Sequence, residues 1–347
     1  MQHLPTFARL LAVAAMLAIA TDAAAQNSLD RIQRRNSTES GEITKVTSLA
    51  VTISKRGVAS TVPSEEIRNI RFAGEPKKLN SVRVAVQKGQ YQQALETLDK
   101  IATEKIERSA IAQEIAFLKT FGTAKLAIGG TGSLEQADAL VTDFLSKNRS
   151  SFHLPEIIEL SGDLAQAAGD PEKARKVYAK LARAPSPYYK ARSAVLVGST
   201  FQAEGKHSEA IAEFDKGLQA TGKHAVASPQ RAEATLLRAI SQAAGGQVQQ
   251  STADINSIIA SAAAEDEVLL AQAYNALGQC YLQSENRKSA RDAYLHVDIL
   301  FESAHEQRAK ALYQLSQLWP TLGHPQRAAD AQQRLKEDYP SSPWANR

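Results

Sequence analysis

From Leu79 onward, apolar positions recur with the spacing of amphipathic helices, and these helices come in pairs separated by glycine-containing turns. A small residue marks the second helix of each predicted pair: Ala94, Ala137, Ala174, Ala210, Ser251, Ala290 and Ala328. The intervals between these positions are 43, 37, 36, 41, 39 and 38 residues. Nearly constant intervals are typical of stacked helical hairpins. We therefore predict a mainly α fold, an α-α superhelical solenoid of about seven hairpins over residues 79–340.

Helix-start and helix-stop signals agree with these intervals. Asp170-Pro171 is an N-cap followed by proline at the first helical position, and residues 133–136 fit a capping box. Pro340 ends the last predicted helix. The remaining tail, residues 341–347, is expected to fold back through Trp344 and cap the solenoid.

A different pattern precedes the helices, in residues 28–75. Residues 51–54 alternate apolar and polar side chains with the period of a half-buried strand, and residues 42–46 and 67–72 are predicted as further strands. Gly41 and Gly57 are expected at turns or bulges. About 45 residues form only a small core, so the segment either makes a compact barrel-like sheet or packs against the first hairpin. It resembles the small SH3-like or Sm-like β modules that precede repeats in some exported bacterial proteins.

The first 25 residues have the pattern of a signal peptide. Arg9 precedes an apolar run of eleven residues, Leu10 to Ala20, whereas a membrane-spanning helix needs about 20. The small residues Ala23 and Ala25 then fit a signal-peptidase site. We predict cleavage after Ala25 and an exported mature chain, periplasmic or extracellular, without a later membrane span. The alternative is an uncleaved N-terminal anchor.

The clearest helix pair resembles the tetratricopeptide repeat (TPR). Its first helix reads Tyr274-Asn275-Ala276-Leu277-Gly278-Gln279-Cys280-Tyr281, and Ala290 and Tyr294 follow in the second. A second copy contains Gly198, Phe201, Gly205, Ala210 and Phe214. The intervals exceed the TPR norm of about 34 residues, which predicts longer helices or loops. The resemblance implies a non-catalytic scaffold for protein-protein interaction, with a concave groove lined mainly by the first helix of each hairpin.

Carried over onto this sequence, the TPR register places nine side chains in the groove. They are Glu159, Asp163, Arg192, Gln202, Asn275, Gln279, Gln283, Lys310 and Tyr313. The resulting surface would run from acidic to neutral or basic and bind a peptide or partner protein through hydrogen bonds to its backbone. For each residue the alternative is an ordinary solvated helix position.

A second function class remains open, an envelope protein associated with a small ligand or a polysaccharide and using the β-rich segment for recognition. Exposed aromatic residues would favour it, but Phe72 is the only aromatic residue of residues 28–75. The first class is therefore preferred.

Composition and short motifs argue against several other classes of function. The formal charge is only +4, and Lys and Arg nowhere gather with aromatic residues, so we expect no nucleic-acid partner. Cys280 is the single cysteine, which excludes an intrachain disulfide, and its helical setting predicts a buried, inert thiol. Residues 129–133 lack the Lys-Ser/Thr of a phosphate loop, and His305-Glu306 lacks the second histidine of a zinc-protease helix. We therefore predict no enzyme activity, no cofactor and no metal; the oligomeric state is left open.

Overall fold

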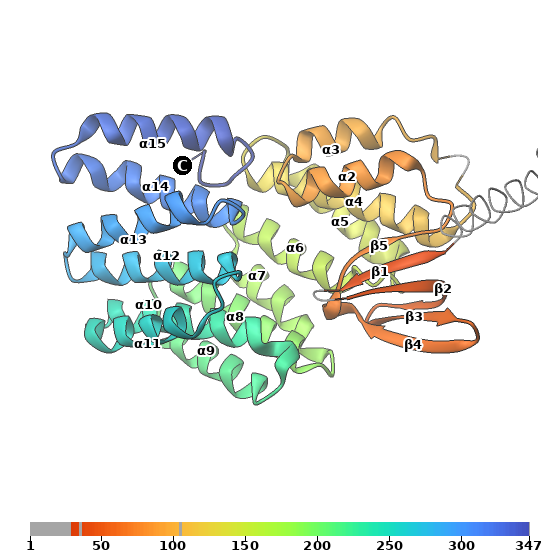
Figure 1. Ribbon diagram of the computed structural model, residues 1–347, viewed down its shortest axis with the longest axis horizontal. Helices are drawn as coiled ribbons and strands as arrows, with labels where there is room; N and C mark the ends of the chain where they lie inside the picture. The colour runs from red at the N-terminus through yellow and green to blue at the C-terminus, as the bar shows by residue number, and fades with distance from the viewer. Residues whose placement is uncertain (1–28, 35–36, 104–105, 347) are drawn as a thin grey trace, which may run out of the picture.

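The computed structural model describes residues 29–34, 37–103 and 106–346, and the predicted signal peptide, residues 1–25, lies outside them. In the described part of the chain, five strands are followed by helices that form seven antiparallel hairpins (Figure 1). The prediction of a mainly α, TPR-like solenoid behind a small β-rich segment is confirmed. No helix among these residues is both long enough and apolar enough to cross a bilayer.

The strands are β1 (Asp30–Arg34), β2 (Thr38–Thr47), β3 (Ala50–Lys55), β4 (Val58–Pro63) and β5 (Ile67–Arg71), with the short helix η1 (Ser64–Glu66) before β5. The first helices of the seven hairpins are α2 (Lys77–Gln87), α4 (Ser109–Ile128), α6 (Leu154–Ala167), α8 (Pro187–Ala203), α10 (Ser228–Ala244), α12 (Glu267–Gln283) and α14 (His305–Thr321). The second helices are α3 (Tyr91–Leu98), α5 (Leu134–Lys147), α7 (Pro171–Tyr178), α9 (His207–Thr221), α11 (Val248–Ser261), α13 (Arg287–Leu300) and α15 (Pro325–Asp338).

The small residues that revealed the repeat lie where the two helices of each hairpin meet. Each is the fourth residue of its second helix. Ala94, Ala137, Ala174, Ala210, Ser251 and Ala290 are fully buried, and Ala328 in the last hairpin is half-buried. A small side chain at this position lets the paired helices approach closely. The periodicity in the sequence is therefore a periodicity of helix contacts.

Glycines in three first helices receive an aromatic ring from the second helix. Gly162 faces Tyr178, Gly198 faces Phe214 and Gly278 faces Tyr294; a Cβ at these glycines would lie 2.2, 2.6 and 2.7 Å from the ring. All three rings are buried. Each ring thus occupies the space that a larger residue on the first helix would need.

The predicted helix starts also have a visible chemical cause. The side chain of Ser133 accepts a hydrogen bond from the backbone N–H of Gln136 at 3.2 Å, and that of Asp170 accepts one from Lys173 at 2.9 Å. These bonds satisfy backbone donors that have no partner within the first turn. The two caps fix where α5 and α7 begin.

The sheet is antiparallel and has the order β4-β3-β2-β1-β5. The long strand β2 pairs with β1 through its first half and with β3 through its second. Gly41 lies inside β2, where the partner changes, and not at the expected turn or bulge; a Cβ there would meet the carbonyl oxygen of Ser54 at 2.3 Å. The register shift of this strand falls between Ile43 and Lys45. Gly57, with φ of 81°, forms the turn between β3 and β4.

The sheet shares its apolar core with the first two hairpins. Ile32, Val51 and Ile70 of the strands pack in one cluster with Leu79 and Val82 of α2. Of the two arrangements considered for residues 28–75, the described part of this segment therefore packs against the first hairpin. The core is continuous from the strands into the solenoid.

Asp30 fastens the sheet to α4 electrostatically. Its carboxylate accepts two hydrogen bonds from Arg108, at 2.6 and 2.7 Å, and one each from the backbone N–H groups of Ile43 and Ala73. Burial would raise the pKa of Asp30, but these donors hold it below its usual value. Bidentate charged hydrogen bonds fix geometry as well as charge, so this contact sets the orientation of the sheet.

Candidate functional site

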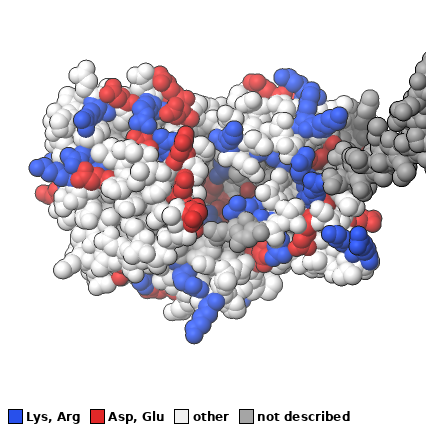
Figure 2. Space-filling model, in the orientation of Figure 1, with Lys and Arg blue, Asp and Glu red and all other residues white. Residues whose placement is uncertain are grey.

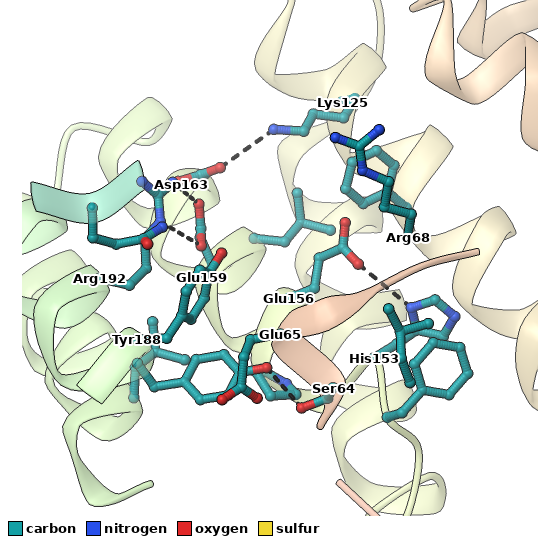
Figure 3. Close-up of a pocket in the computed structure, with 18 residues that line it drawn as sticks. Ser64, Glu65, Arg68, Lys125, His153, Glu156, Glu159, Asp163, Tyr188 and Arg192 are labelled. Carbon is teal, nitrogen blue, oxygen red and sulfur yellow. Dashed lines mark hydrogen bonds and ion pairs between the residues drawn. The ribbon is translucent and has the colours of Figure 1, made fainter. Parts of the chain in front are cut away.

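The concave side of the solenoid meets the sheet at a cavity of about 430 Å³. Four successive first helices, α4, α6, α8 and α10, contribute to its walls, and η1 and β5 close it on the side of the sheet (Figure 3). Figure 2 shows a hollow over α6 in which acidic and basic side chains meet. The first helices line the cavity, as the TPR resemblance implies for the groove.

A second cavity of about 690 Å³ adjoins the first. The two share the lining residues Glu65, Arg68 and Tyr188. The second cavity extends to the start of α10 and α12, where Pro229 and Val268 add apolar surface. The pair therefore forms one channel with a charged half and a more apolar half.

An ion-pair ladder crosses the floor of the channel. Arg192 on α8 binds the carboxylate of Glu159 on α6 and donates to both oxygens of Glu233 on α10, at 3.0 and 2.8 Å. Burial would raise the pKa of Glu159, but Arg192 lowers it more, so this carboxyl lies below its usual pKa. The ladder joins the third, fourth and fifth hairpins.

A second charged group lies beside this ladder. Asp163 accepts a hydrogen bond from the hydroxyl of Tyr178 at 2.7 Å and pairs with Lys125 of α4 at 3.4 Å (Figure 3). Burial, together with the carboxylate, raises the pKa of Tyr178, so the phenol stays protonated and donates. The 3.4 Å contact is long for a charged hydrogen bond, which leaves Lys125 able to bind a further acceptor.

The wall formed by the sheet is attached to α8. The hydroxyls of Ser64 and Tyr189 lie 2.8 Å apart, and Ser186 donates to the carboxylate of Glu65. Arg68 points into the cavity (Figure 3) and forms no hydrogen bond or ion pair with any other residue that the structure describes. A cation is thus presented to the channel without a carboxylate partner in that part of the chain.

A buried charge network supports the opposite wall. Arg83 donates to Glu114 at 2.7 Å and makes two 2.8 Å bonds to Glu75, while Nε2 of His153 lies 2.8 Å from Glu114. The His153 ring stacks on Phe117 with the centroids 3.5 Å apart. Burial alone would lower the pKa of His153, but Glu114 raises it above its usual value. Glu114 therefore favours the charged form of the imidazole at the cavity wall.

This network predicts a pH-dependent effect of His153→Gln. The pKa of His153 is raised on folding, so its charge stabilises fully below the unfolded value of about 6.5 and stops stabilising as pH rises through the folded pKa. The loss of unfolding free energy in His153→Gln should be about 2 kcal/mol near pH 6, the scale of a hydrogen bond to a charged group. It should shrink as the pH rises above 6.5 and passes through the raised pKa of folded His153. Urea titrations of both proteins across this range measure it; a difference that stays constant with pH contradicts the assignment.

The nine side chains predicted to line the groove have three different surroundings. Glu159, Asp163 and Arg192 meet at the cavity. Gln202 lies between hairpins, where its amide donates to the Leu237 carbonyl and the Ser241 hydroxyl, both at 2.8 Å. The other five lie outside both cavities described above.

Of these five, Asn275 is buried, with only 1% of its surface exposed, and its amide donates to Gln307 of α14. This residue joins two hairpins and is not accessible to a ligand. Gln279 is half-buried and Gln283 exposed on α12. Lys310 and Tyr313 of α14 face the ring of Trp344 in the C-terminal tail.

Sequence reasoning missed Arg68, Glu65, Lys125 and His153 as cavity residues. Lys125 was within reach of the TPR register, because it lies on a first helix one hairpin before Asp163. Arg68 and Glu65 carried no such signal, since the curvature of the solenoid brings the sheet to the third and fourth hairpins.

Comparison with known proteins agrees with this fold. Residues 271–298, in α12 and α13, match the family model of the tetratricopeptide repeat. A solved Rap protein in complex with competence and sporulation factor is 14% identical over 77% of this chain and 76% of its own, with a TM-score of 0.52. A search of curated proteins gave no match.

Two further solved structures are similar over comparable lengths. NprR in complex with its cognate peptide NprX is 16% identical over 78% of this chain and 80% of its own, with a TM-score of 0.49. A tetratricopeptide repeat protein from Parabacteroides merdae is 17% identical over 76% and 92%, with a TM-score of 0.47. At such identities the Rap likeness shows the fold alone. Residues 271–298 match the tetratricopeptide repeat, and the glycine-aromatic packing of that hairpin recurs in the third and fourth hairpins, so this chain folds as a TPR-like solenoid.

Proposed function

We propose that this protein is a non-catalytic scaffold that binds an extended peptide segment of a partner protein in the channel between the solenoid and the sheet. The observation that carries the proposal is the cavity lined by four successive first helices and closed by η1 and β5. The structurally similar Rap protein, whose structure is a complex with competence and sporulation factor, supports the idea that such a solenoid can hold a bound partner.

The chemistry of the channel suits a peptide with mixed side chains. Arg68 and Lys125 offer donors at the charged half, and Pro229 and Val268 offer apolar contact in the adjoining cavity. An extended peptide advances about 3.3 Å per residue, so two adjoining cavities accommodate several consecutive residues. We expect an acidic or carboxylate group near Arg68 and an apolar side chain beyond Tyr188.

The proposal includes export, as the apolar run of residues 10–20 and the small residues before Gln26 predict. The partner would then be a protein of the periplasm or the extracellular space. N-terminal sequencing of the exported chain tests this part: a first residue other than Gln26 contradicts the cleavage site.

No observation gives comparable support to the alternative in which the β-rich segment recognises a polysaccharide. Phe72, the aromatic residue of the β-rich segment, is only 4% exposed and lies beneath the guanidinium of Arg108. Stacking on a sugar needs an accessible ring, which Phe72 does not offer.

The test is selection from a displayed library of random dodecamer peptides on residues 26–347, followed by fluorescence polarisation with the best binder. Arg68→Glu should weaken its binding about tenfold, because the variant replaces a cation that contacts the ligand with an anion. Arg71→Glu is the matched control, since Arg71 is exposed on the same strand and lines neither cavity. The proposal fails if no peptide is enriched, or if Arg68→Glu binds as tightly as the wild type.

A further inference from the structure

The C-terminal tail turns back onto α14 after the last helix. Ser342 donates to the carbonyl of Tyr339 at 2.9 Å and Ala345 to that of Ser342 at 3.0 Å, which makes two consecutive turns. Trp344 and Ala345 become half-buried against the apolar core of the last hairpins. This brings the tail back onto the solenoid, as expected from Trp344.

The indole of Trp344 occupies a small subsite on α14. Its ring centroid lies 5.3 Å from that of Tyr313, with the planes tilted by 41°, and 6.0 Å from the ammonium of Lys310. Aromatic pairs at this distance contribute about 0.5–1.5 kcal/mol, and an exposed cation over a ring about 0.5–1 kcal/mol. The contact is favourable but shallow.

The end of the tail reaches a different part of the solenoid. The side-chain amide of Asn346 donates to the carbonyl oxygen of Gly129, at the turn between α4 and α5. Gly129 is buried, and a Cβ there would lie 2.7 Å from the carbonyl oxygen of Ser341. The tail therefore joins the seventh hairpin to the second.

We propose that the tail is an intramolecular ligand of a second binding site. The site consists of Tyr313, Lys310 and the Gly129 carbonyl, and it accepts an aromatic side chain followed within two residues by a side-chain amide. A partner peptide with this chemistry displaces the tail. None of the three residues lines either cavity described above, so the inference does not rest on the proposed function.

Two observations favour a tail that a partner peptide can displace over a tail that is permanently docked. Trp344 is only half-buried, so a competing ring can reach the same surface from solvent. Tyr313 and Lys310 are anchored on a regular helix, and Gly129 follows another, so the site keeps its geometry when the tail leaves. The tail itself shows which chemistry the site prefers.

The test uses the full chain with Trp344→Ala, in which the site has lost its resident ring. The probe is a fluorescein-labelled peptide of residues 339–347, YPSSPWANR. Fluorescence polarisation should give a Kd on the order of 1 mM with the Trp344→Ala protein. Binding to the wild type should be about fivefold weaker or worse, because the attached tail competes at millimolar effective concentration. The same peptide carrying W344A should not bind.

A pair of glycine variants keeps the test specific. In the Trp344→Ala protein, Gly129→Ala should weaken peptide binding about tenfold, because the new Cβ meets the position of the Ser341 carbonyl. Gly132→Ala in the same turn is the control, since its Cβ would make only ordinary contacts at 3.4 Å. Circular dichroism checks that both variants keep their helices.

Three results would overturn the proposal. Equal binding of the peptide to wild type and Trp344→Ala would place the peptide elsewhere, and binding to neither protein would remove the site. A concentration-dependent dimer of the wild type that Trp344→Ala abolishes would show that the tail docks on a second copy instead.

Discussion

Arg83→Met should lower the free energy of unfolding by about 3–5 kcal/mol, the cost of removing one partner from a buried ion pair. Arg83 and Glu114 are each 4% exposed, and Glu75 is 10% exposed. The guanidinium makes three hydrogen bonds of 2.7–2.8 Å to these two carboxylates. Methionine fills a similar volume but leaves Glu75 without its cation, and Glu114 keeps only His153 as a charged partner.

The effect should extend beyond α2, because Glu75 also accepts a hydrogen bond from the backbone of Phe72 at the end of the sheet. Loss of Arg83 therefore loosens the contact between the sheet and the first two hairpins. Urea unfolding followed by circular dichroism measures the change. Arg71→Met is the matched control: Arg71 is exposed on β5, and its variant should stay within about 0.5 kcal/mol of the wild type.

A partial rescue distinguishes charge from packing. In Arg83→Met combined with Glu75→Gln, the carboxylate that has lost its cation is gone, so the double variant should be more stable than Arg83→Met alone. A double variant that loses the sum of both single effects would mean that the side chains act mainly by filling space.

The solenoid could be predicted from the sequence because its contacts are local and repeated. Ala174 meets its partner helix within one hairpin, and the same geometry recurs at Ala210 and Ala290. Such contacts leave a periodic trace in the chain. Asp170-Pro171 independently predicted where α7 begins.

The strand β1 could not be predicted in this way. Its sequence, DRIQR, has one apolar residue, Ile32, which is buried, and a carboxylate, Asp30, which is buried too. Burial of Asp30 depends on Arg108, 78 residues away. A local sequence pattern does not reveal a partner that is so distant in the chain. From the sequence alone, a buried acidic residue therefore cannot be told from an exposed one.

The candidate site could be predicted only in part, because some of its residues come from parts of the chain that are distant in sequence. Glu159, Asp163 and Arg192 lie on neighbouring first helices, and the repeat register places them on one side. Arg68 comes from the sheet, and its position depends on how the whole solenoid curves toward β5. Asn275 has the correct register but is covered by α14, because the next hairpin packs more closely than the register alone reveals.

Gly198→Ala and Gly217→Ala should change stability in opposite directions although both glycines lie in helices of the fourth hairpin. A Cβ at Gly198 would lie 2.6 Å from the ring of Phe214, which is fully buried. Overpacking of this kind costs about 1–3 kcal/mol, which exceeds the gain of about 1 kcal/mol from replacing glycine in a helix. At Gly217 the nearest atoms are 3.5 Å away, so only the gain remains.

Thermal or urea unfolding of the two variants measures the sign directly, and Gly198→Ala combined with Phe214→Leu should recover part of the loss by making room for the new methyl group. Gly162→Ala and Gly278→Ala should also lower stability, because a Cβ at these positions would meet the rings of Tyr178 and Tyr294 in the same geometry. If Gly198→Ala is as stable as Gly217→Ala, the ring must shift at little cost, and the close approach of the helices would not be what makes glycine necessary there. If alanine lowers stability at all three glycines, these three hairpins share one packing arrangement. Its sequence pattern is a glycine followed 16 positions later by an aromatic residue.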